Sequence, residues 1–347
     1  IFLFYLIINL YFSINISNSI PRVIKFIFII FFINELQKIV IKDKYLIDRI
    51  ISFWVIIFLI ISFDIVFEFI FGFNTLGIKS PIWGRISSFF GDELVVGAFY
   101  HFLSLLIIAY LLKKKFTNFS IIILAGVIIL ISFIIGERAN FIKLFLSILI
   151  FLNFTLHISV IKKIVSFFLI LSTVFFVIFS NEDLKTRYYY QLQNVYSVDG
   201  IKNYYKKSQY GAHQETAYQI FKNNFYFGIG IKNFRSESKK KIYENKEFEK
   251  TDWRQATHPH QIHLELLSET GLFGYLIFLI LIFYAVYFSL KNYLKFKKNY
   301  YQLASIIYLL TSLIPLIPTG SIFSTFFGGM FWFNFGLMLS LNYYSKS

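Results

Sequence analysis

Residues 271–290 read GLFGYLIFLILIFYAVYFSL, an uninterrupted apolar run without a charged side chain. An α-helix needs about 20 such residues to cross the hydrocarbon core of a bilayer. The chain as a whole has the same character, because 57% of its residues are hydrophobic and only 15% are charged. A soluble domain has about 25% charged residues. The chain has no cysteine, which excludes a disulfide scaffold. The sequence therefore predicts an all-α, polytopic membrane protein.

Similar apolar runs recur along the chain and predict about ten membrane-spanning helices. They are residues 1–17, 23–34, 50–71, 92–112, 119–136, 139–156, 164–180, 271–290, 302–318 and 320–341. The first run lacks Met and is apolar from its first residue, so we expect the natural N-terminus to lie upstream. A cleaved signal peptide is disfavoured, because no small-residue cleavage site precedes a mature domain. The predicted division is seven spans in 1–180, a large loop with short helices in 181–261, and an interfacial helix with three spans in 262–347.

Lysine and arginine in the short loops predict the orientation, because cytoplasmic loops are enriched in them. One side of the ten-span pattern collects Lys38, Lys42, Lys44, Arg49, Lys113, Lys114, Lys115, Lys162, Lys163, Lys291, Lys295, Lys297 and Lys298. The short loops on the other side hold only Arg22, Lys79, Arg85 and Arg138. We therefore expect both ends of the chain to be cytoplasmic and residues 181–261 to be external.

The net charge of +15 raises the question of a nucleic-acid partner. No RNA- or DNA-binding motif is present, and many of the basic residues flank the spans, where they set the orientation. The excess in the external segment is not explained in this way. An anionic ligand such as a lipid pyrophosphate would suit it.

Residues 257–271, THPHQIHLELLSETG, carry three histidines at the end of the external segment. Helical spacing places His260 and His263 on one face, with Glu265 and Glu269 nearly opposite. Pro259 suits the first turn of this helix, and Thr257 or His258 is the expected cap.

A histidine at the membrane surface could accept a proton from a sugar hydroxyl, because its pKa lies near neutrality. One alternative is an interfacial amphipathic helix whose histidines face water. A zinc site in H-x-H-x-x-H is the other, disfavoured because no further ligand group has matching spacing.

Two arginines lie in short external turns. Arg138 belongs to the hairpin 136–140, where a guanidinium can bind a phosphate with two hydrogen bonds. The alternatives are contact with lipid headgroups or pairing with Glu137. Arg85 lies in residues 83–94, WGRISSFFGDEL, whose glycines and Asp92 are also typical of a turn and helix cap.

The external segment also predicts a helix along residues 213–224, because His213 and several apolar residues share one face. Gly228 and Gly230 then permit a sharp turn. This G-x-G is not a dinucleotide site, since no strand precedes it. In the third span, Asp64 and Glu68 could line a polar cavity or proton path, although a shallow interfacial position is favoured.

Together these segments resemble the O-antigen ligase and polymerase superfamily of bacterial envelope glycosyltransferases. Residues 260–274 resemble the family pattern H-[NSQ]-x-x-L-x-x-x-x-E-x-G, which follows a long external loop and opens a span. Residues 227–235 resemble its G-x-G-x-x-x-F segment. The hairpin 136–138 occupies the place of an S-R hairpin, with Glu137 where Ser is commoner. Residues 85–92 resemble R-x-S-G-x-F-G-D, with Ser88 in place of glycine.

The resemblance implies transfer of a glycan from a polyprenyl pyrophosphate to an acceptor hydroxyl, with inversion and without metal or cofactor. It places the active site on the periplasmic face of the bacterial inner membrane. His260 would be the general base or acceptor-positioning group, and Arg138 would hold the pyrophosphate. Relatives carry a mid-loop arginine that is absent here, so His213 or Arg235 is the expected replacement. The full set of expected substrate-binding residues is Arg85, Arg138, Arg187, His213, Arg235 and His263.

The expected partners are the lipid-linked glycan donor, a glycan or lipid A-core acceptor, and membrane lipids, but no nucleic acid. Ligase and polymerase share the motifs, and we lean to polymerase because nothing in the chain marks a lipid A-core recognition surface. The alternative from another class is a transporter or flippase of lipid-linked sugars. Flippases usually show internal repeats and short loops, and this chain shows no repeat and one dominant loop.

Overall fold

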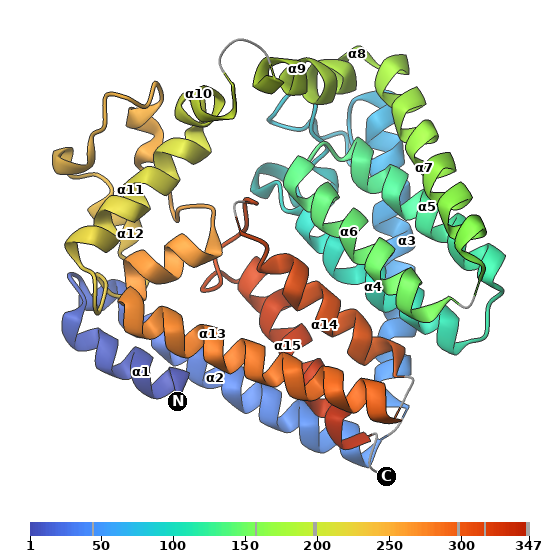
Figure 1. Cartoon of the computed structure of the whole chain (residues 1–347), viewed down its shortest axis with the longest axis horizontal. Helices are drawn as coiled ribbons and strands as arrows, with labels where there is room; N and C mark the ends of the chain where they lie inside the picture. The colour runs from blue at the N-terminus through green and yellow to red at the C-terminus, as the bar shows by residue number, and fades with distance from the viewer. Residues whose placement is uncertain (44, 157, 197–199, 297–298, 316, 345–347) are drawn as a thin grey trace. The chain divides into compact units, whose positions relative to one another are not determined.

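The computed structural model describes residues 1–43, 45–156, 158–196, 200–296, 299–315 and 317–344. These residues form helices and turns without a β-strand, which confirms the all-α class (Figure 1). The predicted cytoplasmic residues Lys44, Lys297 and Lys298 lie outside the described residues. In chain order the elements are α1 (Phe2–Asn9), η1 (Leu10–Phe12), α2 (Ile16–Lys42), α3 (Leu46–Phe71), η2 (Ser88–Glu93), α4 (Val96–Lys113), α5 (Asn118–Ile134), α6 (Arg138–Thr155), α7 (Val160–Ser180), α8 (Glu182–Leu184), η3 (Lys185–Tyr190), α9 (Gln191–Tyr196), α10 (Gly200–Lys207), α11 (Gln209–Asn223), α12 (Phe234–Glu237), η4 (Lys241–Tyr243), η5 (Thr251–Arg254), α13 (Ile262–Phe296), α14 (Tyr300–Ser312) and α15 (Phe326–Tyr344).

Within the described residues, 5 helices are long and apolar enough to cross a membrane. They are α3, α4, α6, residues 161–180 of α7, and α13. Two further helices, Phe2–Phe12 and α5, are apolar but shorter than these five. The chain therefore has the helices of a multi-pass membrane protein, and the number of ten spans stays a prediction.

Each predicted span coincides with a helix, but some bounds differ. The first helix ends at Phe12 instead of residue 17, because a turn follows in which the Asn15 side chain accepts from Ser17 N at 3.1 Å. The span predicted at 302–318 ends at Ser312. Two prolines follow at 315 and 318, and proline cannot donate a helical hydrogen bond. The helix α15 begins at Phe326 instead of residue 320.

The chain folds as two compact units. Unit 1 comprises residues 1–38, 194–292 and 313–339, and unit 2 comprises residues 39–193, 293–312 and 340–347. The segment 181–261 contributes to both units, and its short elements run from α8 to η5. The three-part division made from the sequence stays a prediction.

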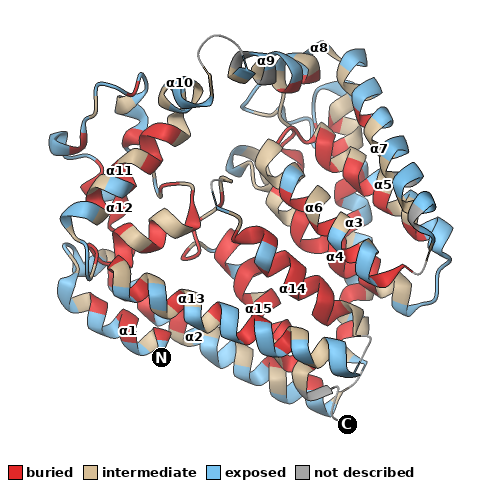
Figure 2. Ribbon diagram, viewed as in Figure 1, coloured by how far each residue is buried: buried red, intermediate tan, exposed pale blue. Residues whose placement is uncertain are grey.

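In unit 2, α4 is the central helix and packs against α3, α5, α6 and α14. Its side chains are buried on nearly all faces, as expected of a helix that is apolar all round. On α3, Phe58 stacks on Tyr100 of α4 with ring centroids 4.5 Å apart. Figure 2 shows α14 almost wholly buried and α7 largely exposed.

In unit 1, an aromatic core joins α1, α2, α13 and α15. Phe2 contacts Phe26 and Phe278 at 5.4 and 5.6 Å, and Phe26 contacts Trp332 at 4.9 Å. A second, smaller core lies under the external segment. It consists of Ala217, Ile220, Ile229, Phe234 and Tyr243. This smaller core fixes α11 and the glycine turn beside the start of α13.

Candidate functional site

Two histidine rings of unit 1 contact the ring of His260, and we call His213, His258 and His260 the histidine cluster. The His213 and His260 rings lie 5.1 Å apart at an interplanar angle of 25°. His258 lies 4.1 Å from His260 on the same measure. The helix α11 brings His213 here, after an N-cap in which Ser208 Oγ accepts from Gly211 N at 2.9 Å. Two of the sequence-predicted residues, His213 and His260, are therefore brought together.

The backbone at His260 is strained. Its φ of +52° lies in the left-handed region, which costs about 1–2 kcal/mol for a residue with a Cβ. The conformation is held because Thr319 N donates to His260 O at 2.9 Å. Strain that is held in place in this way is often found at functional sites.

The helix expected to begin near Pro259 begins instead at Ile262. Its cap is Gln261, whose side-chain oxygen accepts from Leu264 N at 2.8 Å, so the expected cap at Thr257 or His258 is wrong. Since His260 lies before the helix in a left-handed conformation, it does not share a helical face with His263 as predicted. The helical period applies only to residues inside the helix.

Both ring nitrogens of His263 have protein partners. Its Nε2 donates to Leu313 O at 2.8 Å, so its Nδ1 accepts from the Tyr275 hydroxyl at 3.1 Å. These two bonds tie the start of α13 to the segment that follows α14. The contacts explain a structural role for His263, and its expected substrate role stays a prediction.

Burial determines the protonation of His213 and His258. Burial lowers the pKa of His213, and the hydrogen bond to the Trp253 carbonyl opposes this only in part. Burial also lowers the pKa of His258, and the nearby His260 and Lys232 side chains lower it further. Both imidazoles are therefore neutral near pH 7.

The two glutamates of the motif are buried, which contradicts a simple amphipathic helix on the membrane surface. Glu265 and Glu269 are 0% exposed. Glu269 accepts from Lys232 N at 2.8 Å and from Phe234 N at 3.1 Å. Glu265 accepts from Ile322 N at 3.0 Å. Each carboxylate thus holds a backbone segment of unit 1, which sequence spacing alone does not show.

The glycine turn packs directly on the bend in α13. Ile229 N donates to Ser268 O at 3.1 Å and Gly230 N donates to Glu269 O at 2.9 Å. A Cβ on Gly228 would lie 2.5 Å from the carbonyl carbon of Glu269, and one on Gly271 would lie 2.3 Å from Tyr226 O. Gly228 has φ +68°, which confirms the predicted turn. The two motif segments are therefore parts of one structure.

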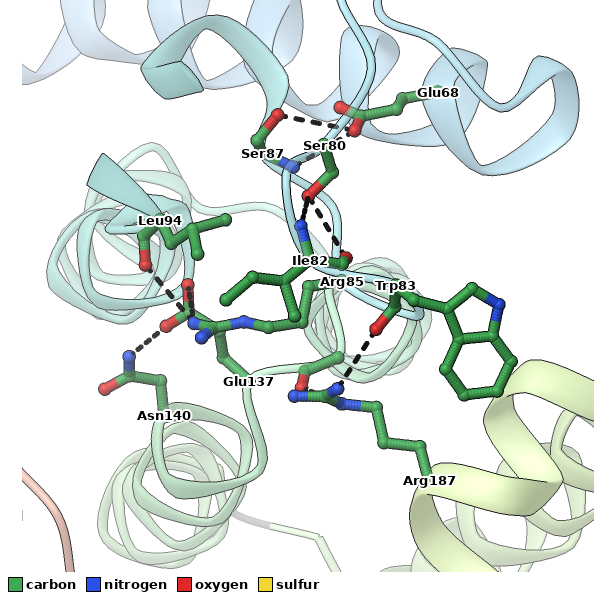
Figure 3. A network of polar contacts seen from close by, with 11 residues as sticks. Glu68, Ser80, Ile82, Trp83, Arg85, Ser87, Leu94, Glu137, Asn140 and Arg187 are labelled. Atoms are coloured by element: carbon green, nitrogen blue, oxygen red, sulfur yellow. Dashed lines mark hydrogen bonds and ion pairs between the residues drawn. The ribbon is translucent and has the colours of Figure 1, made fainter. Parts of the chain in front are cut away.

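Three arginines gather at the hairpin of unit 2, and we call Arg85, Arg138 and Arg187 the arginine cluster. Arg85 pairs with Glu137 at 3.0 Å and donates to Leu94 O at 3.3 Å (Figure 3). Glu137 was considered as an alternative partner for Arg138, but it forms its ion pair with Arg85 instead. Arg138 Nη1 makes one long hydrogen bond to Arg187 O, at 3.5 Å.

Arg187 ties two turns of unit 2 together. Its Nε donates to Gly136 O at 2.7 Å and its Nη1 donates to Trp83 O at 3.4 Å (Figure 3). The turns meet without space for a side chain, because a Cβ on Gly136 would lie 2.4 Å from Gly84 O. The hairpin and the turn that precedes α4 are thus held in close contact.

The carboxylates of α3 also support this site. Asp64 is 0% exposed and Glu68 is 4% exposed, so both side chains lie inside the protein, and their favoured shallow position in the membrane stays a prediction. Ser88 N donates to Glu68 Oε2 at 2.6 Å, and Ser88 Oγ donates to Asp64 Oδ2 at 2.6 Å. Beside them lies a cavity of about 240 Å³. Its polar and charged lining includes Glu68, Lys79, Ser80, Arg85, Asn181 and Asp183.

Arg235 is exposed on α12 and belongs to neither cluster.

Two buried ionisable residues were not predicted from the sequence, His101 of α4 and Lys143 of α6, each 2% exposed. His101 Nε2 lies 3.0 Å from Ser147 Oγ, which in turn lies 2.8 Å from Thr311 Oγ1. The sequence feature that could have identified them is an ionisable residue inside an apolar run. In the described part of the chain, no group of three or more His, Asp or Glu is placed to hold a metal ion.

The model of a protein family described as O-antigen ligase matches residues 95–279, more than half of the chain. The match confirms the resemblance drawn from the motifs. It spans the histidine cluster, Arg138 and Arg187, and Arg85 lies ahead of it. No curated protein matches the chain.

Proposed function

Because this chain belongs to the O-antigen ligase family, we propose that it moves a glycan from a polyprenyl-pyrophosphate carrier to an acceptor hydroxyl. The reaction takes place on the periplasmic face of the bacterial inner membrane, in a protein of about ten spans. The observation that carries this proposal is the placement of His260, whose ring stacks on that of His213 and contacts that of His258, with its strained backbone held by Thr319.

In the proposed step, His260 acts as the general base. The acceptor oxygen bonds to the anomeric carbon while the bond from that carbon to the pyrophosphate oxygen breaks. The electron pair leaves with the pyrophosphate, and the hydroxyl proton passes to the His260 imidazole. Direct displacement from the opposite face inverts the anomeric centre, and neither metal nor cofactor is needed for it.

The arginine cluster is proposed to bind the pyrophosphate. Guanidinium groups stabilise the negative charge that develops on this leaving group. Arg85 is engaged by Glu137, and Arg187 by two carbonyls. Among the described residues, the hydrogen bond found for Arg138 is the long one to Arg187 O. Arg138 is therefore the member best able to turn to a phosphate. Arg85 and Arg187 support it, and Arg235 is an exposed further candidate.

The acceptor is proposed to be another lipid-linked glycan, as in a polymerase, instead of lipid A-core. This preference rests on the lack of any recognisable lipid A-core recognition feature in the sequence. A ligase activity, with lipid A-core as the acceptor, is the alternative, since both enzymes use the same chemistry on the donor.

Replacing His260 with alanine in the native host tests the proposal. Loss of the base is expected to reduce transfer by about 100-fold or more, seen on a gel of envelope polysaccharide. A lost ladder with short material retained indicates a polymerase. Loss of all glycan on lipid A, with lipid-linked chains accumulating, indicates a ligase.

The matched control is Lys246→Ala, because Lys246 is exposed on the same external segment. Both variants must reach wild-type levels in the membrane. A normal polysaccharide pattern in the His260→Ala strain would remove the general-base role.

A further inference from the structure

The hydrogen bonds of His213 determine which of its ring nitrogens carries the proton. Nε2 lies 2.7 Å from the carbonyl oxygen of Trp253. A carbonyl can only accept, so Nε2 holds the hydrogen and donates it. The ring is neutral near pH 7 because burial lowers its pKa. Nδ1 therefore presents a lone pair.

This lone pair is buried and has no hydrogen-bond partner among the described residues. His213 is only 5% exposed. Buried polar atoms in folded proteins are nearly always paired, so an unpaired acceptor of this kind points to a ligand group. That group must be a donor, an O–H or N–H.

A donor requirement changes the ligand expected at His213. A phosphate oxygen is itself an acceptor and would be repelled by the Nδ1 lone pair. The role expected from the sequence, a second contact to the pyrophosphate, is therefore not the one that this geometry favours. A sugar, by contrast, offers several hydroxyl donors on one ring.

We propose that His213 Nδ1 accepts a hydrogen bond from a glycan hydroxyl of the acceptor, adjacent to the hydroxyl that reacts at His260. The ring centroids of the two imidazoles lie 5.1 Å apart, so a sugar bound at His260 would lie close to His213. His213 is then an acceptor-binding residue that selects how the sugar is presented. The inference rests on the proposed function and deepens it.

Two substitutions separate this role from a structural one. In His213→Gln the side-chain amide reaches the position of Nε2 and keeps the bond to Trp253 O, but nothing replaces Nδ1. In His213→Asn the amide lies near the position of Nδ1 and gives up the bond to Trp253 O. A residue that only supports the fold would be rescued by Gln, and a residue that uses Nδ1 would be rescued in part by Asn.

The assay uses purified full-length protein in liposomes. The donor is the host's lipid-linked oligosaccharide, and the acceptor is the oligosaccharide released from it by mild acid. We expect His213→Gln to raise KM for the acceptor by about 10-fold or more, with the donor KM unchanged. A rise in donor KM, or wild-type values for both, overturns the inference.

A second measurement does not depend on a variant. Spectra of ¹⁵N-histidine in the wild-type protein should show a shift of the His213 Nδ1 signal when the released oligosaccharide is added. An unchanged signal at saturating oligosaccharide overturns the inference. Failure of the proposed function is a separate result, because it shows as wild-type protein that binds the oligosaccharide but transfers nothing.

Discussion

At the scale of single residues, His260 owes its position to the backbone on either side of it. His260 itself has φ +52°, and the residue that follows it, Gln261, is the N-cap of α13. The carbonyl of His260 accepts a hydrogen bond from Thr319 N. The ring is thereby directed at His213 and His258 instead of along the helix surface. The types of these residues were predictable from a short motif, but the stacking depends on His213 of α11, which lies more than 40 residues upstream of His260.

The pKa values of His213 and His258 predict how stability depends on pH. Both are lowered in the folded protein, so below about 6.5 the unfolded chain binds protons that the folded chain does not. The stability that these two neutral histidines contribute is therefore fully present above about pH 6.5 and is lost as the pH falls toward their folded pKa values.

Thermal unfolding of the protein in detergent, measured from about pH 7.5 down to about 5.5, checks this prediction. On acidification over this range, the Tm of His213→Gln and that of His258→Gln should rise relative to the Tm of the wild-type protein. Differences in Tm between variants and wild type that stay constant over the range would contradict it.

At the scale of elements, the glycine turn and the bent start of α13 form one structure. Glu269 binds the amides of Lys232 and Phe234, while Gly228 and Gly271 let the two backbones approach. The E-x-G part of the motif is thus explained by backbone packing. It is not evidence that Glu269 takes part in the chemistry.

Replacing Gly271 with alanine should destabilise unit 1 severely. The new Cβ would lie 2.3 Å from Tyr226 O, and the backbone has φ +67°, which a side chain rarely adopts. We expect a loss of about 3 kcal/mol or more, or failure to accumulate. The control is Gly329→Ala in α15, where nothing lies within 4 Å of the added Cβ.

That control should be neutral or slightly stabilising, because alanine favours a helix over glycine. Expression level and thermal unfolding of the two variants give the comparison. A Gly271→Ala protein as stable as the Gly329→Ala protein would mean that the turn does not pack on α13 in this way.

The sequence predicted the helices better than their ends. Apolar runs identify a helix wherever they occur, because the membrane requires every backbone group to be paired internally. The ends depend on local chemistry, such as the prolines after Ser312 and the Gln261 cap. Buried carboxylates such as Glu68 and Glu269 were not predictable, because their partners are amides far along the chain.

At the scale of the whole molecule, the predicted orientation can be tested directly because the chain has no cysteine. Lys114 and Lys241 are exposed and are predicted to lie on opposite sides of the membrane. A single cysteine at either place, in an otherwise unchanged protein, reports its own side.

With a membrane-impermeant maleimide that reaches the periplasm, Lys241→Cys should be labelled in intact cells. Lys114→Cys should be labelled only after the inner membrane is opened. The reverse pattern would invert the orientation and place both clusters' loops in the cytoplasm.

The junction at Arg187 also constrains how the protein is made. Arg187 binds the carbonyls of Trp83 and Gly136, which precede it by 104 and 51 residues. Since the chain leaves the ribosome from its N-terminus, α3 to α7 are synthesised before the side chain that joins their turns exists. The contacts that Arg187 makes to the hairpin at Gly136 are therefore absent while these helices are being inserted. A nascent chain arrested before residue 187 should expose it to proteases, and one arrested well beyond residue 187 should protect it.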